Sequence, residues 1–391
     1  MKEWQKLIVI AGLFLAAYFI PFENPLVGGA IMEALYMLQE YAREHVLFCL
    51  VPAFFIAGAI ANFISQGAVI KYFGSGAKKW VAYSVASVSG TVLAVCSCTV
   101  LPLFAGIYRR GAGIGPAVAF LYAGPAINVL AIILTARILG WQMGLARAVG
   151  AVIFAIAIGL LMAWFCRREE EERLKHCIDQ EDSAEDEQRS PAQNLTFFTT
   201  LVLILIFAAW GRPAEAIGFW SVVYNIKWYI VVMLLVILAY VLKRWFAREE
   251  RADWVETTWE FAKQILPLLF AGVLVAGLLM GRPESDAGLI PARYIESLVG
   301  GNSLQANLIA SVVGAFMYFA TLTEVPILQG LIGAGMGNGP ALALLLAGPA
   351  LSLPNMLVIR SVMGTKNTLI FVALVVLMAT ISGVLFGLIY P

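Results

Sequence analysis

Charged side chains are scarce in this sequence, and their scarcity argues against a soluble protein. Only 13% of the 391 residues are Asp, Glu, Lys or Arg, whereas a soluble domain carries about 25%. The formal net charge is +1, and no basic cluster is interleaved with aromatic residues, which argues against nucleic-acid binding. The chain is instead 61% hydrophobic, with a mean hydropathy of +0.85. This composition predicts a multi-pass membrane protein.

Two further absences limit the chemistry. The nucleotide-binding pattern GxxxxGK[ST] does not occur, so transport driven by ATP would need a separate subunit. The five cysteines are not the even, regularly spaced set of a secreted disulfide framework. We expect no cofactor, and we do not expect an enzyme.

What the sequence does contain is one long stretch in two copies. Residues 87–140 align without a gap with residues 311–364 at a constant offset of 224, and 18 of the 54 aligned residues are identical. The identities include many glycines and prolines, which apolar composition alone would not match. The sequence therefore predicts an internal duplication.

The predicted fold is an all-α polytopic membrane protein with two structural repeats and about 9 to 11 membrane segments, each segment needing about 20 apolar residues. The expected parts are membrane repeat one (1–166), a charged cytoplasmic linker (167–193), a linking helix (194–222) and membrane repeat two (223–391). The linker has almost no apolar residues, so it is predicted to be disordered.

Each repeat has a core segment, residues 81–108 and 304–332, that is too long for an upright helix and contains a proline. Such a segment is either one kinked helix or a re-entrant hairpin. If both segments re-enter, more of the 26 basic residues lie on the cytoplasmic side than if both segments span the membrane. Cytoplasmic loops of membrane proteins carry an excess of Lys and Arg, which favours the re-entrant topology. We therefore expect re-entrant segments and inverted repeats, the usual architecture of secondary transporters.

The tips of these core segments are the predicted substrate pathway. Cys96 and Cys98 stand one residue apart at the first tip, and two thiols can converge on one soft centre because thiolates prefer soft metals and metalloids. They are the predicted ligands of a soft metalloid substrate, with Cys49 as a candidate third ligand. The alternative is that these cysteines are small apolar residues in packed helices.

Other polar and helix-breaking residues complete the predicted site. Glu324 is the one acidic residue well inside a predicted membrane core, where a charge costs at least ~2.5 kcal/mol. It is the candidate for proton coupling, unless it lies hydrated near the outer mouth. The predicted substrate-binding residues are Cys96, Ser97, Cys98, Thr99, Asn128, Thr321, Thr323 and Asn355.

The predicted hinges are Pro102, Gly124, Pro125, Pro326, Gly348 and Pro349. Four of them belong to two AGPA sequences, which are expected to lie in the middle of helices and to open them. For the glycines the alternative role is close helix packing.

At these residues the chain resembles a known family. The CSCTVLP and TLTEVP stretches and the two AGPA sequences are similar to the bacterial predicted-permease family that includes the ArsP organoarsenical efflux permeases. The resemblance covers nearly the whole membrane portion. It implies a permease that exports small substrates, in the best-understood members trivalent organoarsenicals held by membrane cysteines. By position, Cys96 and Cys98 would be that pair, whereas Ala320 and Leu322 offer no further thiolate.

We therefore expect an inner-membrane secondary transporter that moves a small thiophilic solute, a trivalent arsenical or related soft metalloid, out of the cell by alternating access and proton coupling. Its partners would be the small-molecule substrate and the lipid bilayer. The sequence leaves open whether the protein forms a homo-oligomer. The alternatives are a permease for a sulfur compound or soft metal ion, a membrane thiol oxidoreductase using Cys96 and Cys98, and a metal-ion channel, which would need rings of carboxylates.

Overall fold

A computed structural model describes most of the chain, apart from isolated positions before residue 24. The described ranges are 24–64, 78–93, 97–127, 129–170, 172–173, 190–210, 219–282, 287–289, 298–317, 324–333 and 335–390. Within them the regular structure is helical, except for an isolated bridge between Gly300 and Met336. Five described helices are long and apolar enough to cross a membrane. The prediction of an all-α polytopic membrane protein is confirmed.

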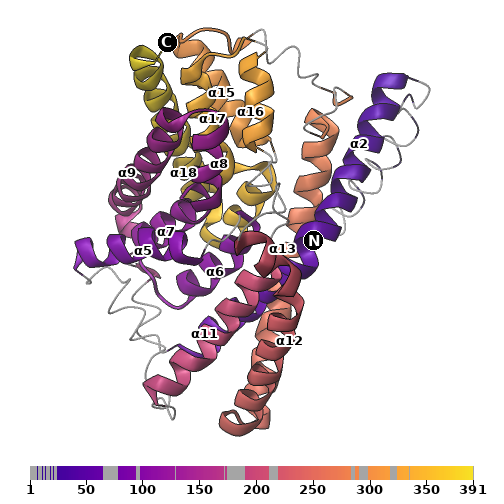
Figure 1. The fold of residues 1–391 in the computed structure, drawn as a ribbon, viewed down its shortest axis with the longest axis vertical. Coiled ribbons are helices and arrows are strands. Elements are labelled where there is room, and N and C mark those ends of the chain that lie inside the picture. Colours follow the sequence, from indigo (N-terminus) through magenta and orange to yellow (C-terminus); the bar gives the residue numbers. More distant parts are fainter. Residues whose placement is uncertain are drawn as a thin grey trace.

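The first described element is a long continuous helical segment. It consists of α2 (Pro25–Tyr41), the π-helix η1 (Ala42–Leu50) and α3 (Val51–Phe63). Asn24 caps the start of α2, because its side chain accepts a hydrogen bond from the Leu26 amide at 3.0 Å. Midway along α2, Glu33 is buried and pairs with Arg282, with 2.8 Å between Oε2 and Nε. This pair ties α2 to the residues that follow α13 (Arg248–Met280), and the two helices lie side by side (Figure 1).

Two described helices come directly before α13 in the chain. They are α11 (Pro191–Ala208), which begins with a capping box between Ser190 and Gln193, and α12 (Phe219–Trp245). The two pack together at the lower end of the molecule (Figure 1). The predicted linker begins before them, and its first residues, 167–170 and 172–173, are helical rather than disordered. Arg173 donates hydrogen bonds to the carbonyls of Tyr108 and Ala112, so the start of the linker is docked. Residues 174–189 lie outside the described ranges.

The remaining helices form two sets. The first is α5 (Lys79–Leu93), α6 (Ser97–Arg109), α7 (Ile114–Ala126), α8 (Val129–Ile138) and α9 (Trp141–Phe165). The second is α15 (Leu304–Phe316), α16 (Glu324–Gly333), α17 (Asn338–Leu351) and α18 (Leu353–Ile389). Adding 224 to the bounds of the first set reproduces those of the second to within three residues, with α18 corresponding to α8 and α9 together.

Glycines with a positive φ occur at matching positions in the two sets, at the same offset of 224. Gly140 separates α8 from α9 with φ 101°, and its counterpart Gly364 interrupts α18 with φ 82° and ψ 165°. Gly111 and Gly335 are a second matched pair, with φ of 91° and 108°. These coincidences are what a duplication predicts. The relative direction of the two copies across the membrane stays a prediction.

Each predicted core segment contains two described helices. The first contains α5 and α6, of 15 and 13 residues, and the second contains α15 and α16, of 13 and 10 residues. The residue after α15 is Met317, whose ψ of 145° is extended, whereas residues 94–96 and 318–323 lie outside the described ranges. At a rise of 1.5 Å per residue these helices are about 15–22 Å long, shorter than a ~30 Å hydrocarbon core. The sides of the membrane on which they begin and end stay a prediction.

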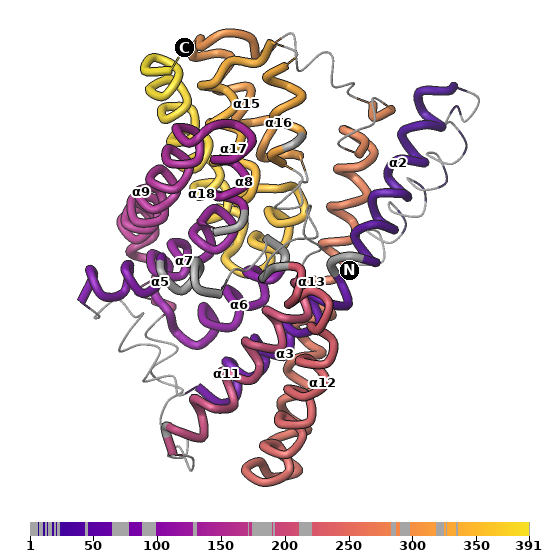
Figure 2. The backbone as a smooth tube through the Cα atoms, viewed as in Figure 1, coloured from indigo at the N-terminus to yellow at the C-terminus, as the bar shows by residue number. Residues whose placement is uncertain are grey.

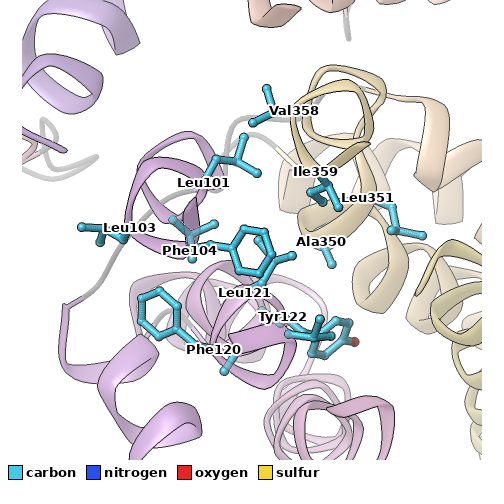
Figure 3. Close-up of a cluster of buried hydrophobic side chains, with 14 of the residues drawn as sticks. Leu101, Leu103, Phe104, Phe120, Leu121, Tyr122, Ala350, Leu351, Val358 and Ile359 are labelled. Carbon is cyan, nitrogen blue, oxygen red and sulfur yellow. The ribbon is translucent and has the colours of Figure 1, made fainter. Parts of the chain in front are cut away.

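The centre of the molecule is the contact between α7 and α17. All 13 residues of α7 are buried, and so are the 13 residues of α17 from Gly339 onward. The hydroxyl of Tyr122 donates a 2.9 Å hydrogen bond to the carbonyl of Leu346, its own counterpart 224 positions on. Around this contact, apolar side chains of α6, α7, α17 and α18 interdigitate (Figure 3). Outside it, α9 and α18 run side by side (Figure 2).

The kink in α18 depends on a conformation that only glycine adopts readily. We expect Gly364→Ala to lower the free energy of unfolding by about 1–3 kcal/mol, because a Cβ at this φ and ψ is strained even though nothing lies within 4 Å of it. Thermal unfolding of the purified protein in detergent measures this. Gly330→Ala is the matched control, because Gly330 lies in a regular helix with equally open space. Equal effects of the two substitutions would contradict the prediction.

Candidate functional site

A buried ion pair joins the two sets of helices. Arg147 lies in α9, and Glu324 is the first residue of α16; Nη2 and Oε1 are 2.5 Å apart. The two side chains are 0% and 1% exposed. Nη1 of Arg147 also donates a 3.0 Å hydrogen bond to the hydroxyl of Thr135 in α8, which donates in turn to the carbonyl of Ala131 at 2.6 Å. Arg147 therefore connects α8 and α9 to the start of α16.

The charge state of this pair follows from its chemistry. A guanidinium stays protonated in proteins, and a carboxylate within hydrogen-bond distance is its natural counter-charge. The positive end of the α16 dipole also favours a negative charge on Glu324. In a medium of low dielectric constant, removing either partner leaves an uncompensated buried charge, which costs about 3–5 kcal/mol. The pair therefore stabilises the arrangement in which α9 and α16 meet.

The sequence pointed to Glu324 but not to Arg147. Glu324 is buried rather than hydrated at a mouth, and its role in proton coupling stays a prediction. The rule that makes an intramembrane carboxylate conspicuous applies equally to an arginine, and Arg147 stands alone in the apolar run of α9. Their counterparts at the 224 offset, Val100 and Phe371, are apolar and buried. The charged contact therefore has no charged equivalent in the other copy.

The predicted cysteine site is described only in part. Ser97, Cys98 and Thr99 form the first turn of α6, so they belong to a helix rather than to an unwound tip. Thr99 is buried, whereas only the helical backbone of Ser97 and Cys98 is described. Pro102 lies inside α6 and has no N–H for the carbonyl of Cys98. Four further predicted residues lie outside the described ranges: Cys96, Asn128, Thr321 and Thr323.

The third candidate cysteine is placed close to α6. Cys49 is buried in η1, and η1 packs against α6. Among the residues that the structure describes, no group of three His, Cys, Asp or Glu side chains could hold a metal ion. The described part of the chain thus contributes no resident metal centre, and the thiol site for a soft substrate stays a prediction.

The four predicted hinges of the AGPA sequences lie near helix ends, not in the middle of helices. Gly124 and Pro125 are in the last turn of α7, which bends by 46° into α8. Gly348 and Pro349 stand close to the end of α17, where the chain turns at Ser352 into α18. The mid-helix prediction was wrong because the apolar character continues across each break and hides it. Pro326 lies in the first turn of α16.

The turn between α17 and α18 contains two buried polar groups. Ser352 and Asn355 are each 2% exposed. Neither Oγ of Ser352 nor Oδ1 of Asn355 has a hydrogen-bond partner within the described ranges. A buried polar atom without a partner costs about 1–3 kcal/mol. Asn355 is one of the predicted substrate-binding residues.

Full-length and broken apolar helices gathered around buried charged and polar groups are the features of a membrane permease. The chain belongs to a family described as predicted permease, ArsP_1, whose model matches residues 31–388. The predicted family is confirmed, and it supports transport rather than catalysis.

Two relatives extend this comparison. The chain is 45% identical over 353 residues to UPF0718 protein MJ0584 of Methanocaldococcus jannaschii, a match that covers 90% of this chain and 94% of that protein. It is 25% identical over 293 residues to UPF0718 protein YraQ of Escherichia coli, covering 75% of this chain and 63% of that protein. No solved structure matches.

The ion pair can be tested against the apolar pair that replaces it in the other copy. We expect Arg147→Met and Glu324→Gln each to lower the free energy of unfolding by about 3–5 kcal/mol, because each leaves its partner buried alone. The double variant Arg147→Phe with Glu324→Val should lie much closer to the wild type, since it reproduces the residues found at Phe371 and Val100.

Denaturant or thermal unfolding in detergent measures these differences. Arg137→Met is the control, because Arg137 is an exposed arginine on α8. A double variant as unstable as Arg147→Met alone would show that Arg147 and Glu324 do not act as a pair.

Proposed function

We propose that this permease is a secondary transporter that moves a small thiophilic solute, a trivalent arsenical or a related soft metalloid, out of the cell. It works by alternating access between two inverted repeats in a bacterial inner membrane and is driven by protons. The observation that carries the proposal is the buried Arg147–Glu324 pair, which joins α9 of repeat one to α16 of repeat two.

The pair provides a physical link between conformation and protonation. A contact between two repeats is made in one state and broken in another when the repeats move relative to each other. Once Glu324 separates from Arg147, its carboxylate is left alone in a medium of low dielectric constant, where a neutral acid is strongly preferred. A proton then takes the place of the guanidinium. Movement of the repeats and uptake of a proton are thereby coupled.

The thiophilic substrate follows from the cysteines beside the break in repeat one. Cys96 and Cys98 precede or begin α6, and a helix that starts inside the membrane exposes backbone groups only where it lines a cavity or is buried in protein. Thiolates at such a break select soft centres. The buried Cys49 lies on an element that packs against α6, and it is the candidate third ligand.

Transport into everted membrane vesicles tests the substrate. We expect the wild type to accumulate trivalent methylarsenite, and Cys96→Ser and Cys98→Ser to lose at least nine tenths of that activity, because an alcohol does not replace a thiolate as a soft ligand. Cys166→Ser is the matched control, since the buried Cys166 at the end of α9 donates to Asn367 and lies outside the predicted site. Equal accumulation in all the variants, or an equal loss in Cys166→Ser, would refute thiolate-dependent transport.

Proton coupling is tested with an imposed pH gradient in the same vesicles. An acidic lumen should increase wild-type accumulation several-fold, because protons leaving the lumen drive the solute in. We expect the Arg147→Phe, Glu324→Val double variant to retain substrate binding and to lose this acceleration, since neither residue can then exchange a proton. Glu324→Gln should lose it too. A gradient effect that survives in the double variant would remove Glu324 from the coupling mechanism.

A further inference from the structure

The start of α18 is an incomplete helix cap. A serine at the N-cap normally accepts a hydrogen bond from a backbone amide in the first turn. Ser190 and Ser303 do this at α11 and α15, accepting from Gln193 and Ala306 at 3.4 and 3.0 Å. Ser352 occupies the same position at α18 and caps no amide of the described chain. The hydroxyl of Ser352 is therefore not used to cap α18.

Asn355 adds a second unused group at the same place. It is the third residue of α18, and the N-cap and third residues of a helix are near neighbours, as the reciprocal bonds of a capping box show. Both side chains are 98% buried, and neither Ser352 Oγ nor Asn355 Oδ1 finds a partner in the part of the chain that is described. Folded proteins satisfy nearly all such atoms. Two such atoms in one turn of a helix are able to accept hydrogen bonds from a ligand.

The surroundings determine the charge of that ligand. On one side α13 approaches so closely that a Cβ on Gly272 would lie 2.5 Å from Cα of Pro354. On another side α6 packs against α18, with Leu101 beside Val358 and Ile359 (Figure 3). An apolar enclosure of this kind disfavours any ion that lacks a counter-charge. A ligand of Ser352 and Asn355 is therefore expected to be small and uncharged.

We propose that the first turn of α18 binds the hydroxyl groups of a small neutral solute, in the hydroxide form in which a metalloid reaches the protein. Ser352 Oγ and Asn355 Oδ1 accept hydrogen bonds from those hydroxyls. This inference rests on the proposed function and narrows its substrate class. It favours neutral hydroxides over bare soft cations, which have no hydroxyl to donate. The thiols are the site for the soft atom, and α18 is the site for its hydroxyl groups.

Boric acid tests the α18 site independently of the thiol site, because it is a neutral trihydroxide without affinity for thiols. We expect millimolar boric acid to raise the thermal unfolding midpoint of the purified wild type, as any ligand of the folded state does. Ser352→Ala and Asn355→Leu should abolish that shift, and Cys98→Ser should retain it. In vesicles, the first two variants should raise the KM for methylarsenite at least tenfold. No shift in the wild type, or a shift that survives in both α18 variants, would overturn the site.

Stability without ligand gives an independent readout. Replacing a buried polar group that has no partner by an apolar group removes no hydrogen bond. Ser352→Ala and Asn355→Leu should therefore keep or raise the unfolding midpoint of the ligand-free protein. Ser303→Ala is the matched control and should lower it, because Ser303 does cap its helix. A midpoint lowered equally in all three would show that Ser352 and Asn355 are structural. If boric acid raises the unfolding midpoint through Ser352 and Asn355 while the wild type does not transport methylarsenite, the hydroxyl site is supported and the proposal of a thiophilic substrate fails.

Discussion

Hydrocarbon offers no hydrogen-bond partner, and this constraint shapes the whole arrangement of helices. A helix can stop inside the membrane only where other parts of the protein enclose its end. Within the described residues the chain leaves the helical conformation at Ile127 after α7, at Met317 after α15 and at Ser352 between α17 and α18. The two innermost helices, α7 and α17, are buried along almost their entire length, and the long helices α9 and α18 pack against them. The full-length helices thus make the interrupted ones possible.

The two copies share this framework and differ in what they place within it. Where repeat two begins α16 with Glu324, repeat one has Val100, and where repeat one has Arg147, repeat two has Phe371. All four residues are buried. The buried Arg147–Glu324 pair is therefore electrostatic, whereas the matched positions carry apolar side chains. The two sets of helices therefore differ in charge at these matched positions.

The sequence predicted the membrane class and the family, because these depend on local composition and on glycines and prolines repeated at a fixed offset. Gly140 and Gly364 were visible as aligned glycines, and their unusual φ values explain why no other residue serves there. The partnership of Arg147 with Glu324 could not be predicted, since 177 residues separate them and nothing local records their contact. Nor could the sequence show that Ser352 fails to cap its helix, because a serine that caps and one that does not look alike. The AGPA sequences were misplaced for a related reason: a break between two apolar helices leaves the hydrophobic run uninterrupted.

The hydrogen bond from Tyr122 to Leu346 bears on how two duplicated halves can diverge. The donor is a side chain, but the acceptor is a main-chain carbonyl, which every amino acid carries. Residue 346 can therefore change its side chain without losing the bond, so long as the helix keeps its course. The bond depends on the side chain of residue 122 but only on the backbone of residue 346. A substitution at Tyr122 removes the donor, whereas a substitution at Leu346 leaves the acceptor in place.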